Sequence, residues 1–189
     1  MTVEQAIAHR ESRRKFSAAP LGLDELAFLL WATQGVRAPG PVRSRRTVPS
    51  AGCRHACETW LYIDRVEGLE PGLYRYLPLG HQLVLQRSWQ EDMPVELDKA
   101  LLEQYWQAPA YFIWTAVPYR MEWRYTTASA KLIAIDVGHV CQNLYLACES
   151  IGCGTCGIGA YDQTAMDAFL GVDGEEEFAL YMAPGGKLA

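Results

Sequence analysis

The chain has 189 residues, a formal net charge of −5 and a pI near 5.4, and half of its residues are hydrophobic. An acidic protein of this kind is not expected to have nucleic acid or an anionic membrane as its main partner. The length predicts a single domain over residues 1–189, and six tryptophans favour an apolar surface covered by a second copy.

The start of the sequence has no basic segment leading into an apolar one, so we expect no signal peptide. The longest apolar run, near residues 26–32, is too short to span a bilayer. These features predict a cytoplasmic protein, in which the six cysteines are thiols rather than a disulfide framework.

Hydrophobic periodicity and capping residues predict the helices. Thr2 and Gln5 form a capping-box pattern at the start of a short helix over residues 3–9. Leu23–Gln34 is amphipathic and is followed by Gly35, a residue suited to ending a helix. Further helices are expected at 95–106, at 131–151 and, after a capping aspartate, up to residue 170.

Alternating or continuous apolar runs predict strands at 59–66, 73–77, 82–86, 111–117 and 178–182. Residues 36–48 are rich in Pro and Arg, have no periodicity and are expected to form a loop. Because the elements do not alternate as regular βαβ units, their order predicts an α+β fold with a mixed or antiparallel sheet flanked by helices.

Three segments far apart in the sequence carry candidate binding chemistry. Arg10, Ser12 and Arg14 offer two cations and a hydroxyl, which a phosphate requires. Pro49–Gly52 and 152–160 offer small residues whose backbone can approach a flat ring closely. Taken alone, the first two segments are more often ordinary turns, whereas together the three suit one phosphorylated, planar cofactor.

Other polar groups leave alternatives open. Cys153 and Cys156 have the spacing of a redox dithiol or of half a zinc site, but no suitable second pair is present, so we predict no metal. Asp136 and His139 could relay a proton, although such a pair is more often a satisfied polar cluster at a helix contact. His55 follows the Pro49–Gly52 turn and could lie near a cofactor, although a lone histidine is more often structural.

Several well-known catalytic motifs are absent from the sequence. It has no G-x-G-x-x-G after a strand, no Walker A sequence, no G-x-S-x-G elbow and no H-E-x-x-H. A Rossmann nicotinamide site and hydrolysis by a catalytic triad therefore have little support.

The series of motifs resembles the nitroreductase superfamily of FMN enzymes, and specifically its SagB-type dehydrogenase branch. The resemblance extends over nearly the whole chain, in the family's order. The matching stretches are Arg10–Phe16, Leu29–Val36, Arg46–Gly52, Gly68–Tyr76, Trp123–Tyr125, Asp136–Leu144 and Gly157–Ala160.

This resemblance implies an intertwined homodimer that binds FMN noncovalently at its interface. It assigns the FMN phosphate and ribityl chain to Arg10, Ser12 and Arg14, with Lys187 as a further phosphate ligand. The isoalloxazine ring would lie along Pro49, Ser50, Ala51 and Gly52, and its reactive N5 would lie near Ile158 and Gly159.

The implied activity is transfer of hydride from NAD(P)H, through flavin N5, to a small-molecule substrate such as a nitroaromatic or a quinone. One alternative is a SagB-type dehydrogenase or oxidase acting on a peptide azoline or a specialised metabolite, with Tyr125 as its catalytic residue. That branch carries Lys-Tyr where this chain has Arg124-Tyr125, and a permanently charged Arg is a poor proton acceptor. Another alternative is a flavin-binding redox sensor that is not an enzyme and uses Cys153 and Cys156.

Overall fold

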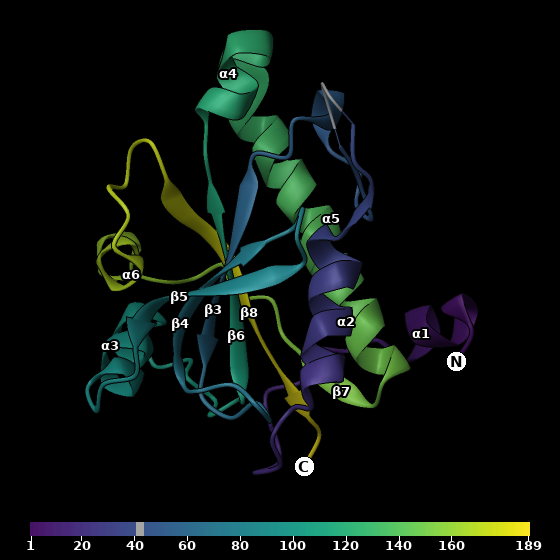
Figure 1. The fold of residues 1–189 in the computed structure, drawn as a ribbon, viewed down its shortest axis with the longest axis vertical. Coiled ribbons are helices and arrows are strands. Elements are labelled where there is room, and N and C mark those ends of the chain that lie inside the picture. The colour runs from purple at the N-terminus through teal and green to yellow at the C-terminus, as the bar shows by residue number, and fades with distance from the viewer. Residues whose placement is uncertain (41–43) are drawn as a thin grey trace.

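The computed structural model describes residues 1–40 and 44–189 and shows three layers, with a sheet between two pairs of helices (Figure 1). One pair is α2 (Leu23–Gln34) and α5 (Ser129–Ser150), and the other is α3 (Met93–Ala100) and α6 (Gln163–Leu170). The remaining helical segments are α1 (Val3–His9), α4 (Tyr119–Tyr125) and the 3-10 turns η1 (Ala51–Cys53) and η2 (Thr126–Ala128).

The main sheet has six strands in the order β5-β4-β3-β6-β8-β7, and every neighbouring pair is antiparallel. Its strands are β3 (Cys57–Ile63), β4 (Gly72–Leu77), β5 (Gln82–Ser88), β6 (Ala110–Ala116), β7 (Cys153–Thr155) and β8 (Phe178–Lys187). Two short strands, β1 (Val36–Ala38) and β2 (Arg45–Arg46), pair separately. The predicted α+β fold with an antiparallel sheet and flanking helices is confirmed.

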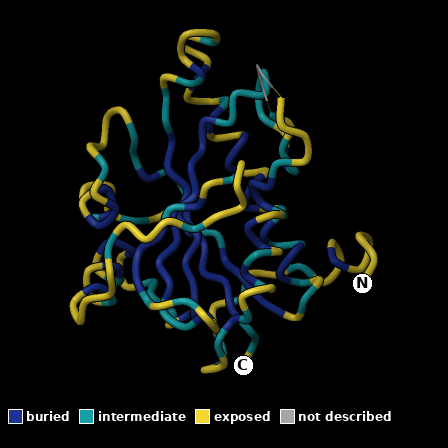
Figure 2. Tube along the Cα trace, in the orientation of Figure 1, coloured by how far each residue is buried: buried dark blue, intermediate teal, exposed yellow. Residues whose placement is uncertain are grey.

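The central strand β3 shows how the sequence alternation builds two cores. All seven of its residues are buried, as the dark centre of Figure 2 shows. Leu61 and Ile63 belong to the core under α2 and α5, whereas Trp60 and Tyr62 belong to the core under α3 and α6. Because each fully buried large apolar side chain contributes roughly 1.5–3 kcal/mol, both faces of this strand stabilise the fold.

The helix-boundary signals near the N-terminus are confirmed. The Gln5 backbone N–H donates to Thr2 Oγ1 at 3.2 Å, and the Thr2 N–H donates to Gln5 Oε1 at 2.9 Å. These two bonds satisfy backbone donors that the first turn of a helix cannot pair internally. At the end of α2, the Gly35 N–H donates to the Trp31 carbonyl at 2.8 Å.

Three predicted boundaries were wrong. The helix expected at 95–106 begins at Met93 and ends at Ala100, because Leu102 and Glu103 adopt positive φ angles of 53° and 64°. The strand expected at 59–66 spans Cys57–Ile63. The last strand continues past Met182 to Lys187, pairing with β6 and then with β7.

Several elements were not predicted from the sequence. α4 and β7 fall in segments for which no element was expected. The stretch 36–48 was predicted to be a loop, but it contains β1 and β2, while residues 41–43 lie outside the described residues. No helix in the described ranges is long and apolar enough to cross a membrane.

Candidate functional site

The segment after α1 runs alongside β7 and is held there by backbone and side-chain bonds. Ser12 forms a parallel bridge with Thr155, and the Arg13 N–H donates to the Thr155 carbonyl at 2.9 Å. Ser12 Oγ lies 3.0 Å from the Tyr145 hydroxyl, which also accepts the Gly157 N–H at 2.7 Å. Tyr145 of α5 therefore joins two of the three segments that the sequence singled out.

Cationic side chains gather at this edge of the sheet. The Arg10 guanidinium lies 5.3 Å from the Tyr145 ring centroid, and Arg14 lies 5.6 Å from that of Trp106. Among residues 1–40 and 44–189, no carboxylate lies within ion-pair distance of either arginine. Lys187 pairs with Cys153 across β7 and β8, and its Nζ lies 3.3 Å from a Glu25 carboxylate oxygen. We call Arg10, Ser12, Arg14 and Lys187 the edge cluster.

Ile158 and Gly159 follow Gly157, whose N–H bonds to the same Tyr145 hydroxyl that Ser12 contacts. The Ile158 N–H donates to the Met182 carbonyl at 2.7 Å, and the Ile158 side chain is buried while Gly159 is exposed. The preceding Gly157 has no room for a side chain, since a Cβ there would lie 2.2 Å from the Tyr181 hydroxyl oxygen. This glycine is required for the close approach of backbone to Tyr181.

The turn formed by Pro49–Gly52 is fixed from both sides. The Ala51 N–H donates to Asp136 Oδ1 at 3.1 Å, and Ser50 Oγ accepts the His55 N–H at 2.8 Å. Gly52 has φ of +58°, a conformation that favours glycine. A Cβ at this position would lie 2.5 Å from the Tyr125 hydroxyl oxygen, so Tyr125 packs directly against the turn.

The Pro49–Gly52 turn and the edge cluster contact α5 at different points. The turn bonds to Asp136, whereas the edge cluster and the Gly157 backbone bond to Tyr145, nine residues later on the same helix. At 1.5 Å per residue this corresponds to about 13 Å along the helix axis. The structure thus links Ser12 to the backbone just before Ile158 through Tyr145, places Lys187 farther along the same edge beside Cys153, and places the Pro49–Gly52 turn elsewhere along α5.

Asp136 is a support for the turn rather than half of a proton relay. Its side chain is buried, and burial raises its pKa while hydrogen bonds from Ser50 and Ala51 oppose the rise. No hydrogen bond joins Asp136 to His139 within the described residues. This arrangement matches the polar-cluster interpretation of the sequence.

The Cys153–Cys156 pair does not have the geometry of a dithiol switch. Both thiols are buried, and burial raises the pKa of Cys153 to about 11. The chain between them is mainly extended strand, which separates Cα atoms three residues apart by about 10 Å. A disulfide requires Cα atoms within about 7 Å, so this spacing argues against the redox-sensor alternative.

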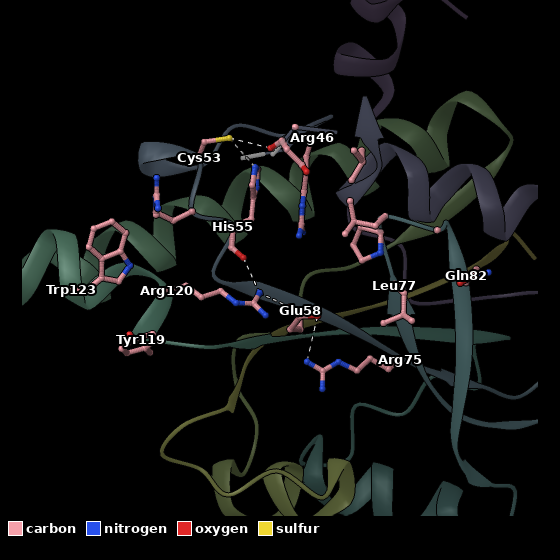
Figure 3. Close-up of a pocket in the computed structure, with 17 residues that line it drawn as sticks. Arg46, Cys53, His55, Glu58, Arg75, Leu77, Gln82, Tyr119, Arg120 and Trp123 are labelled. Carbon is pink, nitrogen blue, oxygen red and sulfur yellow. Dashed lines mark hydrogen bonds and ion pairs between the residues drawn. The ribbon is translucent and has the colours of Figure 1, made fainter. Parts of the chain in front are cut away.

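A large cavity borders the segment that follows the Pro49–Gly52 turn, and no sequence motif predicted it. Its volume is about 860 Å³, and its wall includes Arg46, Cys53, His55, Glu58 and Arg120 (Figure 3). These residues come from β2, the end of η1, the connection after it, β3 and α4, so no contiguous motif contains them all. The available clues were the Arg-rich composition of residues 43–46 and His55, which the sequence had placed near a possible ligand.

Electrostatics inside this cavity are dominated by cations. Burial, together with Arg46 and Arg120, lowers the pKa of His55 to about 4, so the imidazole is neutral at pH 7. Cys53 Sγ lies 3.4 Å from His55 Nε2 and donates to the Ser44 carbonyl at 3.1 Å. Over the described ranges, no three His, Cys, Asp or Glu side chains are grouped so that they could hold a metal ion.

Comparison with known proteins places the whole chain in one family. The sequence profile of the nitroreductase family matches residues 7–187. A candidate nitroreductase of Methanocaldococcus jannaschii is 33% identical over 187 residues, which cover 98% of this chain and 90% of that protein.

Solved structures share the fold. A candidate nitroreductase of Ralstonia eutropha superposes with a TM-score of 0.83 at 25% identity, covering 100% of this chain and 84% of its own. A chain of the Escherichia coli microcin synthetase McbBCD complex, solved with truncated pro-MccB17 bound, superposes with a TM-score of 0.80 at 18% identity, covering 97% and 73%. The chain therefore belongs to the nitroreductase family of oxidoreductases.

Proposed function

We propose that this protein is an FMN-dependent oxidoreductase that passes hydride from NAD(P)H to small electron-poor acceptors such as nitroaromatics or quinones. The observation that carries the proposal is the edge cluster, in which Arg10 and Arg14 lie two residues on either side of Ser12 on one segment and have no carboxylate partner in the described chain. When bound, FMN would supply the chemistry by accepting and giving up hydride at N5.

The edge cluster suits the phosphate end of such a cofactor. Arg10 and Arg14 provide charge, and the Ser12 hydroxyl can turn from Tyr145 to a phosphate oxygen. Lys187 would add a third cation once released from Glu25. The chain's own residues would hold and orient the cofactor, while Ile158 and the Pro49–Gly52 turn would present backbone to its ring.

A homodimer with FMN at its interface is part of this proposal. The outward face of α5 carries Ile135, which is 45% exposed, and Gly138, which has no neighbouring atom within 4 Å of a would-be Cβ. A glycine inside a helix costs up to about 1 kcal/mol relative to alanine, and close approach of another chain would explain it. Light scattering on the purified protein tests this, with a monomer counting against it.

The first experiment is purification without added cofactor, followed by an absorption spectrum and mass identification of any released chromophore. We expect a yellow protein that releases FMN at about one per chain, and bleaching of the flavin by NADH or NADPH. A colourless protein that takes up no added FMN contradicts the cofactor assignment. A yellow protein that neither nicotinamide bleaches contradicts only the electron donor.

A second candidate, oxidation of a peptide azoline or specialised metabolite, is favoured by the position of Tyr125. Its hydroxyl packs against Gly52, within the turn proposed to border the flavin ring. A Tyr125→Phe variant keeps the ring and removes the hydroxyl. We expect unchanged quinone reduction under the leading proposal, and loss of turnover of at least one azoline-containing peptide under the second.

A further inference from the structure

The cavity beyond the Pro49–Gly52 turn has an excess of positive charge. Its wall includes Arg46, Arg54, Arg75 and Arg120, and Glu58 is the only carboxylate among its described lining residues. Glu58 forms ion pairs with Arg75 and Arg120, and Arg75 also lies 3.4 Å from Glu177. The remaining two arginines have no carboxylate within 4 Å in the part of the chain that the structure describes.

Arg46 is the more deeply placed of these two. It donates through Nη1 to Gln34 Oε1 at 2.7 Å, while its Nε is inaccessible to solvent and has no hydrogen-bond partner within the described residues. Burial of this guanidinium lowers its pKa. Glu58 acts on this buried charge only from beyond ion-pair distance, so a bound anion would further reduce the cost of burying it.

Arg54 lines the same cavity. Its Nε donates to the Gly52 carbonyl at 3.0 Å, and its guanidinium lies 4.9 Å from the centroid of the Trp123 ring. The guanidinium groups of Arg46 and Arg54 thus border the same cavity. Trp123 and Tyr119 lie along one wall of it, and Leu77 lies across from them (Figure 3). Guanidinium pairs carboxylates in a bidentate geometry, and the aromatic and aliphatic wall suits an apolar body.

We propose that this cavity binds an organic carboxylate, with the carboxylate on Arg46 and the apolar body against Leu77 and Trp123. At about 860 Å³ the cavity has the size of a site for a drug-sized ligand, which is larger than an inorganic anion requires. The binding site is separate from the edge cluster and does not depend on FMN.

Calorimetric titration of the purified protein with three probes tests this proposal. We expect 2-naphthoate to bind, and expect 2-naphthalenemethanol, which has the same body without the charge, to bind roughly 10- to 100-fold more weakly. Inorganic phosphate should not displace 2-naphthoate at equal concentration. Equal affinity for the naphthoate and the alcohol, or displacement by phosphate, overturns the proposal.

Matched variants locate the binding. Arg46→Gln should weaken 2-naphthoate binding roughly 10- to 100-fold, since it removes a charged partner. Arg45→Gln is the control, because Arg45 is the exposed neighbour on β2 and does not line the cavity. Equal loss in both variants, or no loss in either, contradicts the assigned position.

Alkylation of Cys53 gives a second readout in the unmodified protein. Cys53 lines the cavity and is partly exposed, whereas the other five cysteines are buried. We expect saturating 2-naphthoate to slow its reaction with iodoacetamide severalfold, as followed by mass spectrometry, and the alcohol to have no effect. If Arg46→Gln does not fold, an unchanged alkylation rate in the wild-type protein is enough to reject the proposal.

Discussion

Two arginine-rich regions of this protein hold their charges in different ways. In the edge cluster, Arg10 and Arg14 follow one another on a single segment that lies along β7, and each guanidinium lies over an aromatic ring. In the cavity, Arg46 and Arg54 come from either side of the turn and are surrounded by other arginines. A contiguous segment can be recognised in the sequence, whereas a site assembled from several elements becomes visible only in the fold.

The largest expected effect tests whether the two regions act independently. An Arg10→Gln/Arg14→Gln double variant should weaken FMN binding by about 100-fold or more, because each charge-assisted contact contributes about 1.5–3 kcal/mol. Quenching of flavin fluorescence measures it. Lys15→Gln, an exposed charge on the same segment, is the control.

The double variant should leave 2-naphthoate binding in the cavity unchanged. A parallel loss of both ligands would show that the two regions form one site, although no residue of the edge cluster lines the cavity.

Gly52, in the turn beside the cavity, gives the next largest effect. Gly52→Ala forces a Cβ toward the Tyr125 hydroxyl at a φ of +58°, and we expect a loss of about 2 kcal/mol in the free energy of unfolding. Gly68→Ala is a matched control, because Gly68 has φ of +79° but nothing within 4 Å of its would-be Cβ. Similar losses in both variants, as measured by urea unfolding, would mean that the Tyr125 contact is unimportant.

His55 makes the cavity region sensitive to acid. Its pKa falls from an ordinary 6.5 to about 4 on folding, so the unfolded chain binds more protons and stability is lost as pH falls from 6.5 to 4. His55→Asn should reduce this loss of stability by about 1 kcal/mol, a value that allows for solvent screening. Asparagine is chosen because it tolerates the positive φ of 49° at this position. Denaturant midpoints at several pH values measure it, and parallel curves for both proteins would count against it.

Asp136 is expected to change the pH dependence of stability in the opposite direction from His55, and by less. Burial raises its pKa above the ordinary 3.8, so the folded protein binds more protons and loses stability as pH rises through that window. Asp136→Asn can still accept the Ala51 N–H, so its stability relative to wild type should rise with pH by less than about 1 kcal/mol. A difference that shrinks as pH rises would show that the charged form is the one stabilised.

The sequence predicted elements best where periodicity and capping agree. α1, α2 and the long α5 were found within two residues at each end, and the two hairpin strands were identified. α4 and β7 were missed because each is short, with no more than two turns of helix or three strand residues. β8 extends through Pro184 and two glycines, which normally indicate the end of a strand.

Some of the candidate binding residues could likewise be predicted from the sequence, and others could not. Arg10, Ser12, Ile158 and Lys187 were named from motifs, and the fold brings their segments together around Tyr145 and the β7–β8 edge. Their roles toward a flavin remain predictions. The linking residue Tyr145 and the deep position of Arg46 were not predicted, because both depend on which elements pack together.

The strand order of the sheet has a consequence for how the protein forms during synthesis. β8 lies between β6 and β7, so the last ten-residue strand must be inserted before β7 and the edge cluster are complete. Pairings between segments so distant in sequence make folding slow, since chain closure must precede the contacts that stabilise it. The nascent chain therefore cannot complete this sheet until residues 178–187 have emerged from the ribosome, and until then the edge of β6 that pairs with β8 remains uncovered.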